Sequence, residues 1–419
     1  MSGVSLLPPP GGGASLNPPR TDALDALAPW RDSVAQWFAE HTPANWRERM
    51  RGAPEAEYFE FQRWWLEEQR EIGFAAPHWA KEWGGGGYSL AEQIIIAEEA
   101  ARAGAPRLEL FFHGLFHTYA TLLAAGTQDQ RERYLPRVLE GEMWCQGFSE
   151  PNAGSDLAAL RTRARREGES YLINGQKVWS SQAAHADYCL LLARTGPEGS
   201  GRKGISYFIL DMHTPGLEVR PIKQLTGESE FCELFLDDVE IPAENLIGAE
   251  NEGWGIALGT LSTERSVTLL EMVERLRVTV RRDLTATIAT ATGLTAAPTD
   301  VRWQNLAELH AETEVLGLLS QRVMQDLLDG SGGGAVASIL KLYYSELLQR
   351  VGNFGLQVSG LEAQLVQPLT HGIRFESGDW MYDYLSAWGW TIGGGTNEIQ
   401  RNLIAERVLG LPREPKVGK

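Results

Sequence analysis

The sequence predicts a multidomain α+β protein with a helical N-terminal domain, a central antiparallel β domain and a C-terminal helical bundle domain. Apolar residues recur at three- and four-residue spacing in segments such as 59–72 and 90–103, which is typical of amphipathic helices. Between residues 144 and 250 the pattern changes to short β-branched and aromatic runs separated by turns, which predicts strands. Helical periodicity returns after Asn251 and continues to Leu409, interrupted by a Thr/Ala-rich stretch at 284–300 and a glycine tract at 330–334. Because strands and helices do not alternate throughout, this order argues against a doubly wound sheet.

The domain boundaries follow these changes in pattern. We expect a disordered lead segment at 1–21, a helical domain at 22–143, a β domain at 144–250, a second helical domain at 251–413 and a tail at 414–419. The N-terminus has neither the cationic start nor the apolar core of a signal peptide. No run approaches the roughly 20 apolar residues of a membrane helix, so the sequence predicts a cytoplasmic protein without a membrane span.

Two helix starts in the first domain carry a local motif. Ser89 with Glu92, and Thr127 with Gln130, have the capping-box spacing that satisfies free N–H groups at a helix start. Both positions are therefore predicted to begin helices.

The β domain contains one predicted hairpin. Asn174-Gly175 separates the runs 171–173 and 177–179. A type I′ turn needs two residues that tolerate positive φ, and Asn-Gly is such a pair. We therefore expect the chain to reverse at this point.

Composition narrows the function classes. The chain has 419 residues, of which 43% are apolar, so it can bury a large core without disulfides or metals. Its formal charge of −17 argues against nucleic-acid binding, which requires a basic surface. An anionic ligand remains compatible with this charge, because such a ligand needs only a local basic or helix-terminal pocket.

No metal site is predicted from the cysteines and histidines. Cys145, Cys189 and Cys232 are widely spaced and lack a CxxC pair, so we expect reduced, packed thiols. His113 and His117 have helical i,i+4 spacing but no acidic third ligand nearby. They are expected to pack or to line a pocket.

Two glycine tracts, 84–87 and 330–334, are expected to be loops between helices. Residues 330–335 satisfy a loose dinucleotide-binding pattern, but neither tract follows a predicted strand in a βαβ unit. A phosphate-binding role is therefore disfavoured.

Two stretches of the β domain, 144–156 and 173–181, combine small residues, hydroxyls and aromatic rings. Glycine and serine let the backbone approach a flat polar ligand closely, while Trp179 offers an aromatic face. Taken singly, each stretch could also be an ordinary turn with a core tryptophan. Together they suggest a ligand site.

These stretches closely resemble the flavin-binding segments of acyl-CoA dehydrogenases, and the resemblance extends from about Leu27 to Arg413. Further matching segments are Gly73-Phe74-Ala75-Ala76-Pro77, residues 82–85, 126–128 and 134–136, Asp238-Val239-Glu240-Ile241-Pro242, Gly393-Gly394-Gly395-Thr396-Asn397-Glu398-Ile399-Gln400-Arg401, and residues 405–410. The resemblance implies that noncovalent FAD lies between the β and C-terminal domains. It implies α,β-dehydrogenation of an acyl-CoA, with an electron-transferring flavoprotein as electron acceptor and a homomeric or heteromeric dimer or tetramer as the assembly.

The resemblance also assigns site residues position by position. Cofactor contacts are implied for Phe148, Ser149, Gly154, Ser155, Trp179, Ser181, Gln357, Gly395, Thr396 and Glu398, and substrate contacts for Ser155, Arg265 and Gly394. Gly395, Thr396 and Glu398 match residues that approach the FAD of an associated subunit. A glycine loop that opens into a helix at Thr396 would present unpaired N–H groups to an anionic cofactor.

The catalytic base departs from the pattern of the best-known members. Many carry a glutamate immediately before the C-terminal Gly-Thr pair, where this chain has Gly394. A smaller branch places the base on the first long helix of the C-terminal domain, before an arginine, and Glu264 precedes Arg265 at the matching point. The resemblance therefore implies that Glu264 removes the α-proton. The alternative is a solvated helix glutamate, the role we expect for Glu271 and Glu274.

Other departures leave rival functions open. The arginine and Phe-Gly pair that usually reach the FAD diphosphate are replaced by Arg281-Arg282-Asp283-Leu284, and Leu361 stands where a second glycine is usual. The adenosine end of FAD could be held differently, or chiefly by a partner chain. One rival is a non-catalytic subunit of a heteromeric dehydrogenase. Another is a relative that uses oxygen, as a flavin oxidase or monooxygenase.

Overall fold

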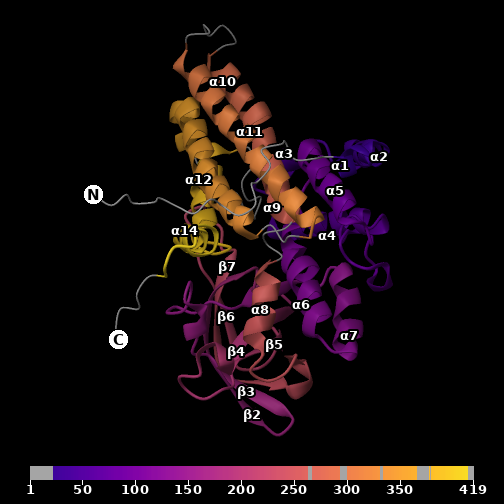
Figure 1. The fold of residues 1–419 in the computed structure, drawn as a ribbon, viewed down its shortest axis with the longest axis vertical. Helices are drawn as coiled ribbons and strands as arrows, with labels where there is room; N and C mark the ends of the chain where they lie inside the picture. Colours follow the sequence, from indigo (N-terminus) through magenta and orange to yellow (C-terminus); the bar gives the residue numbers. More distant parts are fainter. Residues whose placement is uncertain are drawn as a thin grey trace, which may run out of the picture.

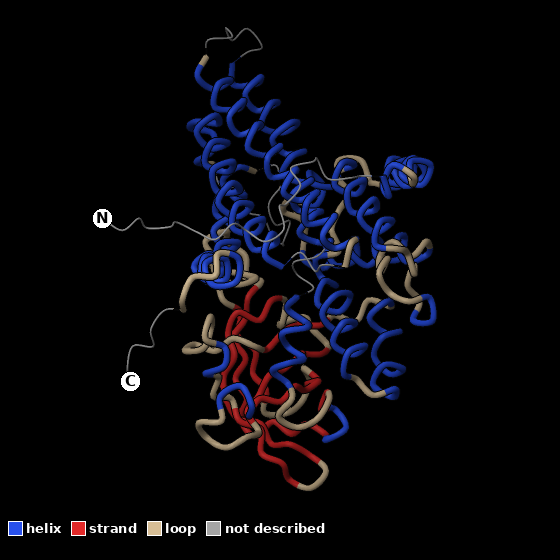
Figure 2. The backbone as a smooth tube through the Cα atoms, in the orientation of Figure 1, coloured by secondary structure: helices blue, strands red, loops and turns tan. Residues whose placement is uncertain are grey.

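A sheet and two sets of helices build the molecule, with the sheet at one end and most helices at the other (Figure 1, Figure 2). The structure is a computed structural model that describes residues 22–262, 267–292, 300–330, 334–365, 377 and 379–413. The order is helical, then β, then helical, as predicted. Within the described residues, no helix is long and apolar enough to cross a membrane.

The N-terminal part is helical throughout. Its helices are α1 (Asp22–Asp25), α2 (Ala28–His41), α3 (Trp46–Met50), α4 (Glu55–Glu71), α5 (Leu90–Ala103), α6 (Tyr119–Ala125) and α7 (Gln128–Leu139), with short turns η1 (Lys81–Trp83), η2 (Glu109–Phe111) and the π-helical η3 (His113–Thr118). Both predicted capping boxes are present, at Ser89 and at Thr127. The glycine tract 84–87 forms a loop between η1 and α5, as expected.

The middle part is one eight-stranded, mainly antiparallel sheet. Its strands are β1 (Trp144–Gly147), β2 (Arg163–Glu167), β3 (Ser170–Ser181), β4 (Tyr188–Arg194), β5 (Ile205–Asp211), β6 (Leu217–Pro221), β7 (Phe231–Pro242) and β8 (Leu246–Ile247). Seven of them follow the order β6-β7-β3-β2-β4-β5-β8, and β1 pairs in parallel with β4. The three cysteines are free and buried in this domain, as the sequence predicts.

The hairpin prediction at Asn174-Gly175 is wrong, because β3 runs unbroken through both residues. The chain instead reverses between β2 and β3, near Gly168. The Asn174 side chain donates to the Asp238 carboxylate at 2.8 Å, so it is bound by the neighbouring strand rather than by a turn. A Cβ on Gly175 would stand 2.4 Å from Thr162 Oγ1, so this glycine permits a close approach of the backbone.

The C-terminal part is again helical. Its elements are α8 (Gly253–Ser262), α9 (Val267–Val278), η8 (Thr279–Leu284), α10 (Thr285–Thr292), α11 (Val301–Leu328), α12 (Gly334–Ser359), η9 (Gly360–Gln364), α13 (Trp380–Ala387), η10 (Trp388–Thr391), α14 (Asn397–Leu403) and η11 (Ile404–Val408). Part of the Thr/Ala-rich stretch is therefore helix α10. One apolar core joins α2, α4 and α5 to α9, α11 and α12, so the two helical parts pack as one bundle.

The expectation of surface charges at Glu271 and Glu274 is wrong. Glu274 is only 7% exposed and pairs with Arg102 and Arg277, while Glu271 pairs with Arg275 and lies 3.6 Å from Arg107. These cations come partly from the N-terminal domain, so the periodicity of α9 alone does not reveal them. Each carboxylate thus has two arginine partners, which offset the cost of burying its charge.

Candidate active site

The two stretches that the sequence singled out meet in space. β1 ends at Gly147, and the loop that follows lies against β3. The Val178 N–H of β3 donates to the Ser149 carbonyl of this loop at 2.9 Å. The Lys177 ammonium donates to the Phe148 carbonyl at 3.2 Å. These contacts hold residues 148–155 beside the end of β3.

A buried ion pair lies under this loop. Lys177 Nζ is 2.8 Å from Glu150 Oε1, and the Lys177 side chain is fully buried. Burial acts to raise the pKa of Glu150, but the Lys177 ammonium and the hydrogen bonds from Thr162 and Arg161 hold that pKa below its ordinary value. Burial lowers the pKa of Lys177, and Glu150 opposes that shift. Sequence reasoning missed this pair, since a Lys in a strand is ordinarily exposed.

Trp179 projects out of the sheet. It is 58% exposed, has φ 65, and stands at a shift in the pairing register of β3 with β7 between Lys177 and Ser180. A β-bulge of this kind re-aims a side chain. Gln182, just beyond the strand, also has a positive φ of 58, and such strain in non-glycine residues clusters at functional sites.

The loop presents small groups on its outer side. Gly154 and Ser155 are exposed, and a Cβ on Gly154 would meet no described atom within 4 Å. Ser149 and Ser181 are half-buried. The Phe148 ring instead points inward, against Tyr207 at 5.5 Å, so this residue offers its backbone rather than its ring to the outer side.

A glycine turn precedes α14 in the C-terminal domain. Gly394 and Gly395 have φ values of 64 and 88, a left-handed conformation that favours glycine. Thr396 caps α14 by accepting the Ile399 N–H at 3.2 Å, as the sequence predicts for a helix start here. The buried Lys341 donates to the Gly395 carbonyl at 2.8 Å and fixes the turn. The sequence analysis did not single out Lys341 as a residue that holds this turn.

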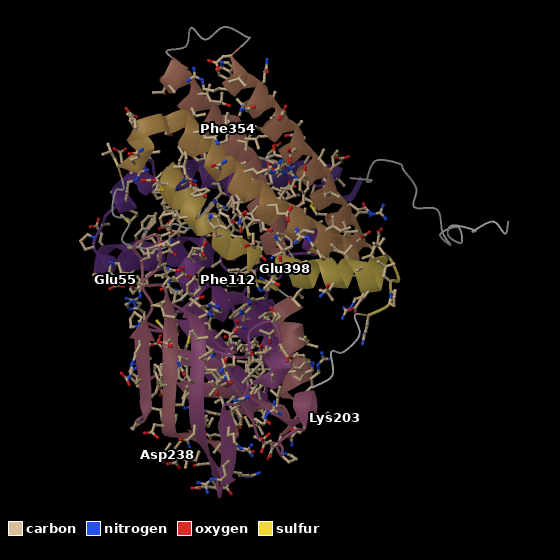
Figure 3. The ribbon with its side chains drawn as sticks, turned by 90° about the vertical axis from the view of Figure 1, so that its left-hand side faces the viewer. Glu55, Phe112, Lys203, Asp238, Phe354 and Glu398 are labelled. Carbon is tan, nitrogen blue, oxygen red and sulfur yellow. The ribbon has the colours of Figure 1, made fainter. Side chains whose placement is uncertain are left out.

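This turn and the tryptophan segment lie where the helical domains meet the sheet. Tyr382 on α13 donates to Glu228, in the loop that leads into β7, at 2.7 Å. Figure 1 shows α14 next to the same end of the sheet. Figure 3 places Phe112 and Glu398 at this junction, whereas Asp238 and Lys203 lie toward the far end of the sheet. The Glu398 side chain is 78% exposed.

Aromatic and imidazole rings form a wall on the N-terminal side of the junction. Phe112 stacks on Phe116 at 5.1 Å, Phe116 stacks on His78 at 4.8 Å, and His113 meets His117 edge to face. Burial lowers the pKa of both His78 and His117 to about 4, so both rings are neutral near pH 7. The wall, which we call the η3 wall, contacts both β1 and α8.

Several residues that the sequence analysis discussed for the active site are not among the described residues of this junction. Glu264 and Arg265 lie outside the described residues, between α8 and α9 in the sequence. Gln357 is exposed near the end of α12. Arg281, near the position of the usual diphosphate-binding arginine, pairs with Glu314 of the same chain at 2.5 Å.

The residues at the junction fit a flat, anionic cofactor such as FAD. The bulge presents one exposed indole face, the loop offers hydroxyls and an open glycine, and the glycine turn leads into a capped helix start. An isoalloxazine ring needs an aromatic or apolar contact together with a few polar groups, and this arrangement supplies both. Arg281, near the family's usual diphosphate-binding position, is half-exposed and already pairs with Glu314.

Comparison with known families covers nearly the whole chain. Models of the acyl-CoA dehydrogenase N-terminal, middle and C-terminal domains match residues 26–142, 145–239 and 251–409. Acyl-CoA dehydrogenase IpdE1 of Mycolicibacterium smegmatis is 36% identical over 405 residues, which cover 92% of this chain and 98% of that protein. Acyl-CoA dehydrogenase FadE34 of Mycobacterium tuberculosis is 38% identical over 360 residues, which cover 83% of this chain and 47% of that protein.

Solved structures agree with these matches. The Tcur3481-Tcur3483 steroid ACAD superposes with a TM-score of 0.79 at 30% identity, covering 94% of this chain and 99% of that one. The ChsE4-ChsE5 complex from Mycobacterium tuberculosis superposes with a TM-score of 0.76 at 31% identity and the same coverage. The chain therefore belongs to the acyl-CoA dehydrogenase family, whose members are oxidoreductases with FAD as cofactor.

Proposed function

We propose that this protein catalyses the α,β-dehydrogenation of an acyl-CoA thioester to the 2-enoyl-CoA. The single observation that carries the proposal is the junction of the 148–155 loop with the Trp179 bulge, in a sheet that has α14, the helix after the Gly394–Thr396 turn, next to one end (Figure 1). Bound FAD would accept, at flavin N5, the hydride that leaves the β-carbon of the substrate.

The chain itself must remove the α-proton, which is weakly acidic in a thioester. Removal needs a polarised carbonyl and a carboxylate of raised basicity. Glu264 is the proposed base, because the usual base position is Gly394 and no carboxylate is available there. Main-chain N–H groups near Gly394 would donate to the thioester carbonyl and stabilise the developing negative charge. Arg265 and Ser155 are the further proposed substrate contacts.

The η3 wall favours a bulky, ring-bearing acyl group. Phe112 is half-buried, so part of its ring can contact a ligand, and it begins a stacked series that runs through Phe116 to His78. Flat apolar rings gain from stacked or edge contacts with such side chains. A steroid ACAD is among the structural relatives, which supports the same substrate class for this chain.

A second chain is proposed to complete the cofactor site. Within the part of the chain that the structure describes, Arg277 and Arg281 both pair with Glu314, so the arginines near the family's usual diphosphate-binding position already have a carboxylate partner. Large apolar side chains are exposed around the glycine turn, including Trp388, Ile392 and Leu409. Exposed large apolar side chains on neighbouring segments are typical of protein interfaces. The ChsE4-ChsE5 relative is a complex of two different chains, which supports a heteromeric assembly, and an electron-transferring flavoprotein is the proposed electron acceptor.

The experiment that tests the proposal is anaerobic titration of the purified chain, alone and with candidate partner chains, with ring-bearing and linear acyl-CoAs. We expect one noncovalent FAD per site, bleaching of the flavin absorbance by substrate, and a product two hydrogens lighter than the substrate. A colourless protein that takes up no FAD with any partner would overturn the proposal. Reoxidation by oxygen at a rate comparable to turnover would favour the oxidase alternative.

A further inference from the structure

The buried ion pair between Lys177 and Glu150 connects more of the site than two side chains. Glu150 accepts the N–H groups of Arg161 and Thr162 at 2.6 and 2.8 Å, just before β2 begins. Lys177 donates to the Phe148 carbonyl at 3.2 Å from the middle of β3. The pair thus ties the loop after β1 to two strands of the sheet.

The pair also marks the base of the bulge. Lys177 is fully buried and Trp179, two residues later, is 58% exposed, although residues two apart in a regular strand share a face. The register shift between Lys177 and Ser180 separates their directions. Lys177 and Val178 are both buried, so the indole turns outward directly after two buried residues, and the Lys177 ammonium anchors the first of them.

The loop above the pair is a tight turn. The Glu150 N–H donates to the Ala153 carbonyl at 3.1 Å, and the Ala153 N–H donates back at 3.0 Å. The residues that follow, Gly154 and Ser155, are the exposed members proposed to face the flavin. The Glu150 side chain points inward from the first residue of this turn. Its bonds to Lys177 and to the Arg161 and Thr162 N–H groups therefore fix the position of the turn relative to the sheet.

Stability alone does not explain such a pair. Replacing a buried ion pair by apolar residues of similar volume is often neutral or stabilising, because desolvation offsets the attraction between the charges. This pair does, however, set a geometry that apolar side chains would not set, because its hydrogen bonds join particular backbone N–H and C=O groups. The four hydrogen bonds of this pair all connect to the segments that carry the proposed cofactor contacts.

We propose that Lys177 and Glu150 are positioning residues that hold the 148–155 loop and the Trp179 bulge in register for the flavin. Neither side chain touches the cofactor itself. The inference rests on the proposed placement of the flavin against these two segments. It names the ion pair as the cause of the alignment between the 148–155 loop and the Trp179 bulge. It also predicts a loss of FAD affinity that does not follow the loss of thermal stability.

The test uses the full chain, with its partner chain where FAD uptake requires one, and four variants. Lys177→Met and Glu150→Gln each remove one charge, and the double variant removes both while keeping the side-chain shapes. Ile173→Ala is the matched control, because Ile173 is fully buried in the same strand, pairs there with Ala164 and Val239, and is given no cofactor contact by the family resemblance, so its truncation leaves a cavity away from residues 148–155 and 177–181. For each, FAD affinity is measured by flavin fluorescence, and thermal stability is measured without FAD.

We expect each single variant to weaken FAD binding at least tenfold and to alter the shape of the flavin absorption band. The double variant should recover thermal stability relative to the single variants but not FAD affinity. Ile173→Ala should lower thermal stability while FAD affinity stays within about threefold of the wild type. Hydrogen exchange of residues 148–155 in FAD-free protein should speed up in Lys177→Met but not in Ile173→Ala.

The contrary results are distinct. Wild-type affinity in the double variant, or affinity that simply follows thermal stability across all four variants, would overturn the positioning role and leave the proposed function intact. Absence of FAD from the wild-type assembly would overturn the proposed function first. If Lys177→Met does not fold, Lys177→Arg keeps the charge but displaces it, and unchanged FAD affinity in that folded variant would equally refute the proposal.

Discussion

Removal of the Trp179 side chain should weaken FAD binding without harming the fold. The indole is 58% exposed, and its ring contact with Phe231 is edge to face at 6.1 Å. The backbone at this residue has φ 65, which costs a non-glycine residue roughly 1 kcal/mol. Trp179→Gly should therefore leave the free energy of unfolding of the FAD-free protein unchanged or higher, while Trp179→Ala should change it little.

The size of the binding defect follows from the exposed indole area. A tryptophan buries about 150–250 Å² when fully covered, so a ring stacked on the exposed part would cover about 100 Å². At about 25 cal/mol per Å², this area is worth about 2.5 kcal/mol. Loss of the contact should weaken FAD binding by about tenfold to sixtyfold, allowing for some compensating rearrangement.

The assay is a fluorescence titration of FAD into the apo-assembly, paired with thermal unfolding of the same preparations. Trp179→Phe retains an aromatic face and should lie between the wild type and Trp179→Ala in affinity. Unchanged FAD affinity in Trp179→Ala, together with a large loss of thermal stability, would refute the reasoning. That outcome would make the indole a structural side chain rather than a cofactor contact.

Three further predictions concern other parts of the molecule. Phe112→Ala should lower kcat/KM for a ring-bearing acyl-CoA by about fivefold to 150-fold, equivalent to about 1–3 kcal/mol of transition-state stabilisation, and should affect a short linear one far less, as measured by competing the two substrates. Burial raises the pKa of Glu142 to about 7 against the opposing effect of Arg137, so the folded protein keeps a proton that the unfolded chain loses above its ordinary pKa of 4.5. The free energy of unfolding therefore falls by at most about 3 kcal/mol as the pH rises from about 4.5 to 7. Glu142→Gln should reduce the loss of Tm between pH 5 and pH 8, and an unchanged profile of Tm against pH would contradict this. In Gly147→Ala, the new Cβ would stand 2.9 Å from both Cys189 Sγ and Leu191 Cδ1, so unfolding should become easier by about 1–3 kcal/mol in denaturant titrations, and a neutral effect would contradict the tight packing.

Local sequence predicted features whose causes are local. The caps at Ser89 and Thr127 depend on side chains within three residues, and both are present. The Asn174-Gly175 turn prediction failed because the decisive partners are distant in sequence: Asp238 lies on β7 and Thr162 lies just before β2. A dipeptide that prefers a turn was therefore overruled by tertiary contacts.

The same distinction separates the predicted and missed site residues. The flavin segments were found through their resemblance to a family, and the structure brings residues 148–155 and Trp179 together. Lys177, Glu150 and Lys341 were missed because burial of a charged side chain depends on partners that are distant in sequence. Glu271 and Glu274 were misassigned for the same reason.

The most direct test of the central claim is stopped-flow flavin reduction, under anaerobic conditions, by Glu264→Gln with a saturating ring-bearing acyl-CoA. Glutamine keeps the size and much of the hydrogen bonding of the side chain but removes its basicity. A control variant, Glu264→Thr combined with Gly394→Glu, moves a carboxylate to the more usual family position and should recover part of the rate. We predict that Glu264→Gln binds substrate but reduces its flavin at least about a hundredfold more slowly than the wild type. Near-normal flavin reduction in Glu264→Gln would contradict the assignment of Glu264 as the base.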